Sequence, residues 1–98
     1  MELPNKPLKT EKTTMTIEDI SKKLHEEFSE EIQGANMYMD MAEDAERLGH
    51  SETAYYLSEI AKDEYSHACY IYMYLNENNI PIDKEDSDDW NKLMNRFR

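Results

Sequence analysis

Apolar residues recur at steps of three and four along two long stretches of the chain. The inward positions, in chain order, are Leu24, Phe28, Ala35, Tyr38, Ala42, Leu57, Ala61, Ala68, Ile71 and Leu75. This period is that of an amphipathic α-helix. Val and Thr, whose alternation would indicate strands, are scarce. The pattern therefore predicts an all-α fold with two long helices, over residues 16–48 and about 51–77.

The predicted helices have recognisable ends. Thr16 followed by Asp19 is typical of a capping box at a helix start, and Gly49 favours a stop after the first helix. Ser51 is expected to cap the second helix, which should end before Pro81 because the residue before proline avoids the helical region. The turn between the helices is short, so we expect an antiparallel helical hairpin.

Three segments follow from this pattern. Residues 1–15 are expected to be a disordered N-terminal arm, residues 16–80 a helical hairpin, and residues 81–98 an acidic linker with a short third helix. In that third helix Trp90 and Phe97 are expected to cover the bundle end or a neighbouring dimer. Two helices alone bury little surface, so we expect a second copy to complete the core as a four-helix bundle.

Composition and charge exclude several classes of partner. The formal net charge of -11 disfavours nucleic acid and anionic membrane, while cations suit such a surface. No stretch resembles a membrane span or an apolar signal region, which predicts a cytoplasmic protein. Cys69 is the single cysteine, so the chain can form neither an internal disulfide nor a CxxC pair.

Two carboxylates interrupt the apolar stripes. Glu31 falls on an inward step of the first helix, and Glu64 falls on one of the second, with His67 one turn further on the same side. Glu31 lies 17 residues before Leu48 and Glu64 lies 16 residues after it. In an antiparallel hairpin, residues equally far from the turn stand side by side. We therefore expect Glu31 and Glu64 to meet near mid-helix.

Such a pair indicates a cation site. Two carboxylates at close range repel each other unless one is protonated or a cation lies between them. Oxygen and imidazole ligands in this mixture suit iron, manganese or zinc. One hairpin offers two Glu and one His, and a homodimer doubles the set. Four Glu and two His are the ligands of di-iron four-helix proteins.

The stretches "EIQGANMY" (31–38) and "EYSH" (64–67) resemble the first half of a ferritin-like or rubrerythrin-type di-iron bundle. Because no second half follows, the chain is most similar to the encapsulated ferritins, whose single hairpins dimerise to build an iron site. The resemblance implies that Glu31 is a terminal iron ligand, that Glu64 bridges two irons and that His67 caps one of them. Tyr38 matches a tyrosine near the metal.

The same resemblance implies a function. It predicts a ferroxidase that oxidises Fe(II) to Fe(III) for iron storage or detoxification, assembled as a ring of five dimers and housed inside an encapsulin shell. Glu30 matches an acidic residue that passes iron toward the site, whereas Gln33 replaces a second one. Two alternatives stay open: a rubrerythrin-like peroxide reductase, and a non-enzymatic helical oligomer with a structural metal site.

Overall fold

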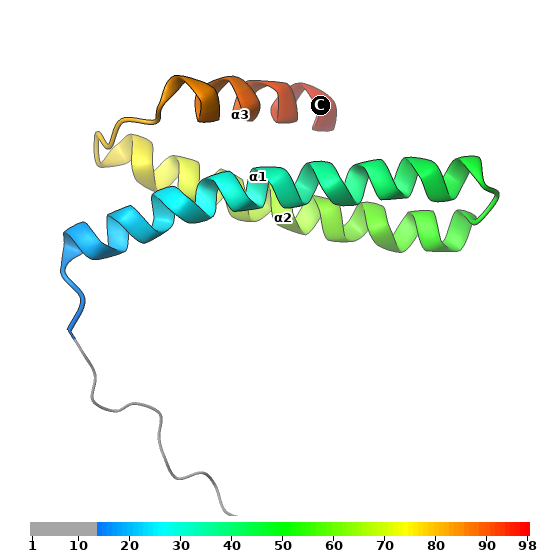
Figure 1. The fold of residues 1–98 in the computed structure, drawn as a ribbon, viewed down its shortest axis with the longest axis horizontal. Coiled ribbons are helices and arrows are strands. Elements are labelled where there is room, and N and C mark those ends of the chain that lie inside the picture. Colours follow the sequence, from blue (N-terminus) through cyan, green and yellow to red (C-terminus); the bar gives the residue numbers. More distant parts are fainter. Residues whose placement is uncertain (1–13) are drawn as a thin grey trace, which may run out of the picture.

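The computed structural model describes residues 14–98, and three helices account for most of them. These are α1 (Ile17–Arg47), α2 (Ser51–Glu77) and α3 (Lys84–Phe97). α1 and α2 form an antiparallel hairpin, and α3 lies alongside the half of the hairpin away from the turn (Figure 1). The prediction of an all-α chain is confirmed over this range. The predicted disordered arm lies, up to residue 13, outside the described residues.

The ends of α1 follow the sequence closely. The Thr16 hydroxyl accepts a hydrogen bond from the Asp19 backbone N–H at 3.0 Å, and the Asp19 carboxylate accepts one from the Thr16 N–H at 3.2 Å. This is the predicted capping box, which satisfies two N–H groups at the helix start. Gly49 follows the C-terminal end with φ +85°, a conformation that glycine adopts without strain.

The predicted cap of α2 is wrong. Ser51 is already the first helical residue, and the N-cap is His50, whose side chain makes no capping hydrogen bond. The turn sets this position: the His50 N–H donates to the Ala45 carbonyl at 2.8 Å, and the His50 carbonyl accepts from the Ala54 N–H at 2.9 Å. The tight turn therefore brings the chain into the helix one residue earlier than the sequence suggested.

The predicted acidic linker is largely helical. α3 begins at Lys84, because the Asp83 side chain caps it by accepting from the Asp86 N–H at 2.9 Å. Glu85 and Asp86 lie in the first turn, where the helix dipole favours negative charge. Lys84 pairs with Asp88 one turn later at 2.9 Å. The acidic residues that predicted a solvated linker therefore form the N-cap and first turn of α3.

The core has two layers of contact. The seam between α1 and α2 buries Phe28, Ala35, Ala68 and Leu75, as well as Ile32. The second layer is α3, which buries Trp90 and Leu93 against that seam. The Trp90 ring stacks on Tyr65 at 5.5 Å and on Tyr72 at 5.3 Å between centroids, and Phe97 stacks on Tyr65 at 4.5 Å.

These contacts correct the expected place of the third helix. Trp90 and Phe97 pack on α2 of their own chain, along one side of the hairpin and not over its end. The expected contact with a neighbouring dimer stays a prediction. Tyr65 and Tyr72 are seven residues apart, which puts both rings on one side of α2 where a tryptophan fits between them. Arg96 adds a polar contact to α1, donating to the Asn36 amide oxygen at 2.8 Å and to the Asp40 carboxylate at 2.6 Å.

Residues 14–98 leave the other side of the hairpin uncovered. We call it the open face; it consists of Glu31, Glu64 and the apolar residues that lie at helical steps from them, namely Leu24, Tyr38, Met41, Leu57, Ile60 and Ile71. Met41 is 43% exposed and Ile60 39% exposed. Apolar side chains that gather on one face are typical of a surface that a partner covers, whereas single exposed ones are ordinary.

Candidate metal centre

Glu31 and His67 meet across the seam between α1 and α2. The Nδ1 atom of His67 lies 3.4 Å from Oε1 of Glu31. At this distance the charges attract when the imidazole is protonated, but the contact is too long for a good hydrogen bond. The Glu31 side chain is 18% exposed, whereas that of His67 is 57% exposed. The imidazole is therefore held beside the carboxylate at the surface of the open face.

Glu64 lies against α1 at the position of Gly34. A Cβ atom built on Gly34 would stand 2.6 Å from Oε1 of Glu64 and 3.3 Å from its Cδ. The carboxylate of Glu64 therefore fills the space that a side chain at residue 34 would occupy. Since Gly34 comes three residues after Glu31, one turn along the same side of α1, the two carboxylates lie next to each other.

The environment of Glu31 disfavours its charged form. Burial raises the pKa of the Glu31 carboxyl, and the neighbouring Glu64 carboxylate raises it further, while His67 acts in the opposite direction. Within residues 14–98, Oε1 of Glu31 is buried and has no hydrogen-bond partner. A buried acceptor without a donor costs about 1–3 kcal/mol. A bound cation would satisfy this oxygen and offset the repulsion.

The side-chain types in this cluster fit iron, but the cluster is not a complete metal site by itself. Carboxylate oxygens and imidazole nitrogens are ligands that iron, manganese and zinc accept. In the part of a single chain that the structure describes, no group of three or more His, Cys, Asp or Glu side chains is arranged to hold a metal ion alone. Glu31, Glu64 and His67 would therefore need ligands from outside residues 14–98 of one chain to hold a metal ion.

The other predicted site residues are placed more loosely. Tyr38 lies half-buried on the open face, two turns after Glu31. Glu30 is exposed, and so is Gln33, whose amide donates to the Ser29 hydroxyl at 3.2 Å. The roles assigned to Tyr38 and Glu30 stay predictions. The sequence did not single out Gly34 as a residue of this cluster. One signal was available, because a glycine inside a long helix is unusual in a chain with two glycines, and this one lies near the candidate ligand Glu31.

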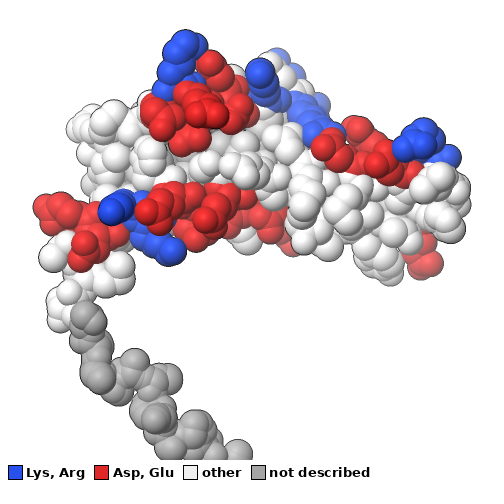
Figure 2. Space-filling model, viewed as in Figure 1, with Lys and Arg blue, Asp and Glu red and all other residues white. Residues whose placement is uncertain are grey.

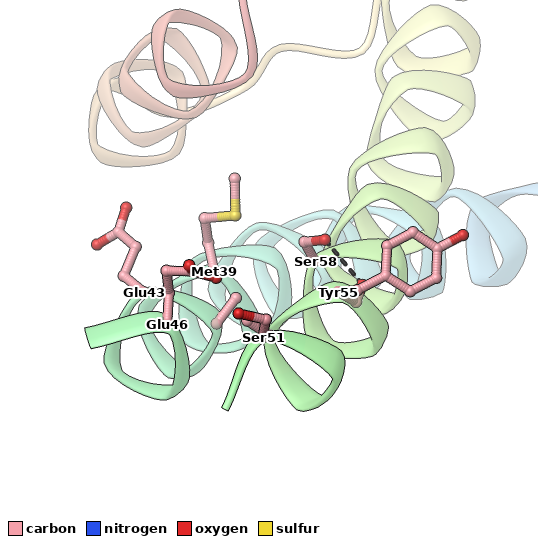
Figure 3. Close-up of a pocket in the computed structure, with 8 residues that line it drawn as sticks. Met39, Glu43, Glu46, Ser51, Tyr55 and Ser58 are labelled. Atoms are coloured by element: carbon pink, nitrogen blue, oxygen red, sulfur yellow. Dashed lines mark hydrogen bonds between the residues drawn. The ribbon is translucent and has the colours of Figure 1, made fainter. Parts of the chain in front are cut away.

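A hollow near the turn is separate from this centre. It has a volume of about 320 Å³ and is lined in part by Met39, Glu43, Glu46, Ser51, Tyr55 and Ser58 (Figure 3). Glu43 also faces Arg96 of α3 at 3.3 Å, so the hollow lies on the side of the hairpin that α3 covers, beyond the end of that helix. None of Glu31, Glu64 and His67 lines it.

Charge is unevenly distributed over the surface. Figure 2 shows acidic side chains gathered along the first half of α1, at the start of α3 and again near the turn end of α1. Glu31 and Glu64 belong to a chain that carries 22 acidic and 11 basic residues. Such an excess of negative charge attracts cations over a distance of about 8–10 Å at moderate salt.

No helix within residues 14–98 combines the length and apolarity that crossing a membrane requires.

The helical hairpin with paired carboxylates and an adjacent histidine is that of a ferritin-like di-iron protein. Comparison with protein families agrees: the sequence pattern of the Rubrerythrin family matches residues 22–94, which include all three helices almost entirely. The chain belongs to the rubrerythrin family. No solved structure matches it.

Proposed function

We propose that two copies of this chain pair through their open faces into a four-helix bundle that holds two irons, and that the dimer is a ferroxidase of the encapsulated-ferritin type. One observation carries the proposal: Oε1 of Glu31 is buried without a hydrogen-bond partner in residues 14–98, next to Glu64 and His67. A buried carboxylate without a hydrogen-bond donor is unfavourable in the metal-free chain, and a bound cation would stabilise its charge.

The second copy follows from the ligand count and from the surface. One chain offers Glu31, Glu64 and His67, half of the four Glu and two His that a di-iron bundle uses. Over half of the His67 side chain faces outward, where another chain could meet it. The apolar residues around it would be buried by pairing, at roughly 25 cal/mol per Å² of apolar surface.

Iron would supply the redox chemistry: two Fe(II) substrate ions each lose one electron, and dioxygen takes both electrons with two protons to give hydrogen peroxide. The chain contributes the surroundings. Glu31 and Glu64 would provide negative charge that matches the ions, and His67 a neutral nitrogen ligand. The Tyr38 hydroxyl would orient a carboxylate. The apolar residues of the open face would exclude water from the paired carboxylates, and Glu30 would lie on the route of iron toward the site.

The first experiment replaces one ligand without changing its shape. Glu31→Gln should abolish Fe(II) binding, which we expect to saturate at about one iron per chain in the wild type. The same substitution should stabilise the metal-free protein at pH 7, because it removes a carboxylate with a raised pKa. Anaerobic titration, oxygen uptake and urea denaturation measure these effects.

A matched control removes the same charge elsewhere on α1. Glu26 is exposed, so Glu26→Gln should change neither the binding stoichiometry nor the oxygen uptake. If Glu31→Gln binds and oxidises iron as the wild type does, the proposed site is wrong. If the wild type binds zinc tightly but oxidises no Fe(II), and Glu31→Gln loses the zinc binding, the site is a structural metal site.

Pairing is tested on the open face itself. Ile60→Lys places a charge in the proposed interface and should convert the dimer to a monomer that binds no iron. Met73 is 51% exposed and lies on the opposite side of α2 from Glu64, so Met73→Lys is the control and should stay dimeric. Sedimentation equilibrium measures the mass. It also reports whether the dimers assemble further into the ring of five that we propose for storage within an encapsulin shell.

Peroxide reduction is the second candidate, favoured by the family match to Rubrerythrin. In that reaction hydrogen peroxide takes two electrons and two protons to give two waters, and a separate electron donor restores the reduced site. Stopped-flow mixing of the Fe(II)-loaded protein with either oxidant decides between the two. Faster oxidation by dioxygen supports the ferroxidase, and faster oxidation by hydrogen peroxide supports the reductase.

A further inference from the structure

We propose that Gly34 is a positioning residue, whose missing side chain leaves the space in which the Glu64 carboxylate lies beside Glu31. The inference rests on the proposed metal site and deepens it, because it adds a residue that ligates nothing yet decides where a ligand stands. The Glu64 carboxylate lies against the backbone of α1 at residue 34, in the space that a side chain there would fill.

The geometry is specific to this pair of residues. A Cβ on Gly34 would lie 2.6 Å from Oε1, 3.3 Å from Cδ and 3.8 Å from Cγ of Glu64, and the three atoms nearest to it all belong to Glu64. A separation of 2.6 Å between a carbon and an oxygen that are not bonded is well inside the contact distance. Even the smallest side chain at residue 34 would therefore displace the carboxylate.

No feature of the backbone accounts for this glycine. Among residues 14–98, the glycine with positive φ is Gly49, where the turn requires it; Gly34 lies within the regular part of α1. A glycine inside a helix is less favourable than alanine, because it loses more conformational freedom on folding. Alanine at residue 34 would thus stabilise the helix, whereas only glycine leaves room for the Glu64 carboxylate.

Substitution by alanine should separate these two effects. Glu64 has a flexible side chain, so Gly34→Ala leaves a folded helix but turns the carboxylate away from Glu31. We expect the dissociation constant for Mn(II), measured by anaerobic calorimetry, to rise by at least about tenfold, as for residues that orient metal ligands. Adding Glu64→Asp, which shortens the side chain by one methylene, should recover part of the loss in the Gly34→Ala background. Equal affinity of Gly34→Ala and the wild type overturns the proposal.

A measurement without metal tests the contact by itself. Against a Glu64→Ala background the new methyl group meets no carboxylate, so Gly34→Ala should raise the melting temperature. Against the wild-type background the rise should be smaller or reversed. The same rise in both backgrounds would overturn the proposal, because residues 34 and 64 would then be uncoupled. If the wild type binds no Mn(II), the proposed metal site fails, while this coupling still decides whether Gly34 seats Glu64.

Discussion

Replacing Trp90 by alanine should remove most of the free energy that docks α3 on the hairpin. Trp90 is 4% exposed and contacts Phe28, Tyr65 and Tyr72. A tryptophan buries about 200 Å², which at about 25 cal/mol per Å² amounts to about 5 kcal/mol. Removing the indole also removes a buried N–H that has no hydrogen-bond partner within residues 14–98, a gain of about 1 kcal/mol. We expect a net loss of about 4 kcal/mol.

Phenylalanine is the matched substitution at this position. Trp90→Phe keeps an aromatic ring between Tyr65 and Tyr72 and leaves a smaller cavity than alanine does. It also removes the unpartnered N–H, and this gain in stability offsets part of the cost of the cavity. We expect Trp90→Phe to lose about 1–2 kcal/mol, well below the loss in Trp90→Ala. A loss as large as that of alanine would show that the indole N–H has a partner, such as a water or another chain.

The assay is urea denaturation followed by circular dichroism at one fixed protein concentration, because pairing of chains would itself add to stability. Trp90 is the single tryptophan, so its fluorescence in the wild type reports directly on the docking of α3. The emission should shift to longer wavelength when α3 detaches. A change of less than about 1 kcal/mol in Trp90→Ala would refute the packing of α3 described above.

Two other predictions concern charges around α3. Arg96→Ala removes the hydrogen bonds to Asn36 and Asp40. Because Asp40 is largely exposed, the loss of unfolding free energy should be at most about 1 kcal/mol and should shrink in high salt. A loss that does not change with salt would contradict an ionic contact. Burial, together with the charge of Asp83, raises the pKa of Asp86 above its ordinary value of 3.8. The folded chain then holds this proton more tightly than the unfolded chain, so stability should fall as pH rises from about 3.8 through the raised pKa. Asp86→Asn should lack this fall and be the more stable protein at pH 7 in urea denaturation, and parallel pH profiles would contradict it.

The hairpin could be predicted because its signals are local. Helical period, the capping box at Thr16 and the stop at Gly49 are each set by residues close together in sequence. The meeting of Glu31 with Glu64 could also be predicted, since a short antiparallel turn fixes which residues stand opposite each other. The contact of Glu31 with His67 was not predicted. The ligand roles of these residues stay predictions that rest on the resemblance to the encapsulated ferritins, and the Fe(II) titration tests them.

The third helix could not be placed because its contacts are distant in sequence. Trp90 reads as one apolar residue in an acidic stretch, and the rings that receive it, Tyr65 and Tyr72, lie on a second side of α2 that the single-stripe pattern ignored. Asp83 reads equally well as a linker residue or as a helix cap. Tertiary packing decides between these alternatives, and local propensity does not.

The position of α3 bears on the site even though α3 contributes no candidate ligand. A two-helix hairpin has two broad sides on which another helix can pack. α3 packs on one of these sides. Its Trp90 stacks on Tyr65 and Tyr72, and its Arg96 donates a hydrogen bond to Asp40. In the proposed dimer the second chain would cover the open face, where Glu31 and Glu64 lie. Because α3 already occupies the other side, that pairing would bring the carboxylates of one chain to those of its partner.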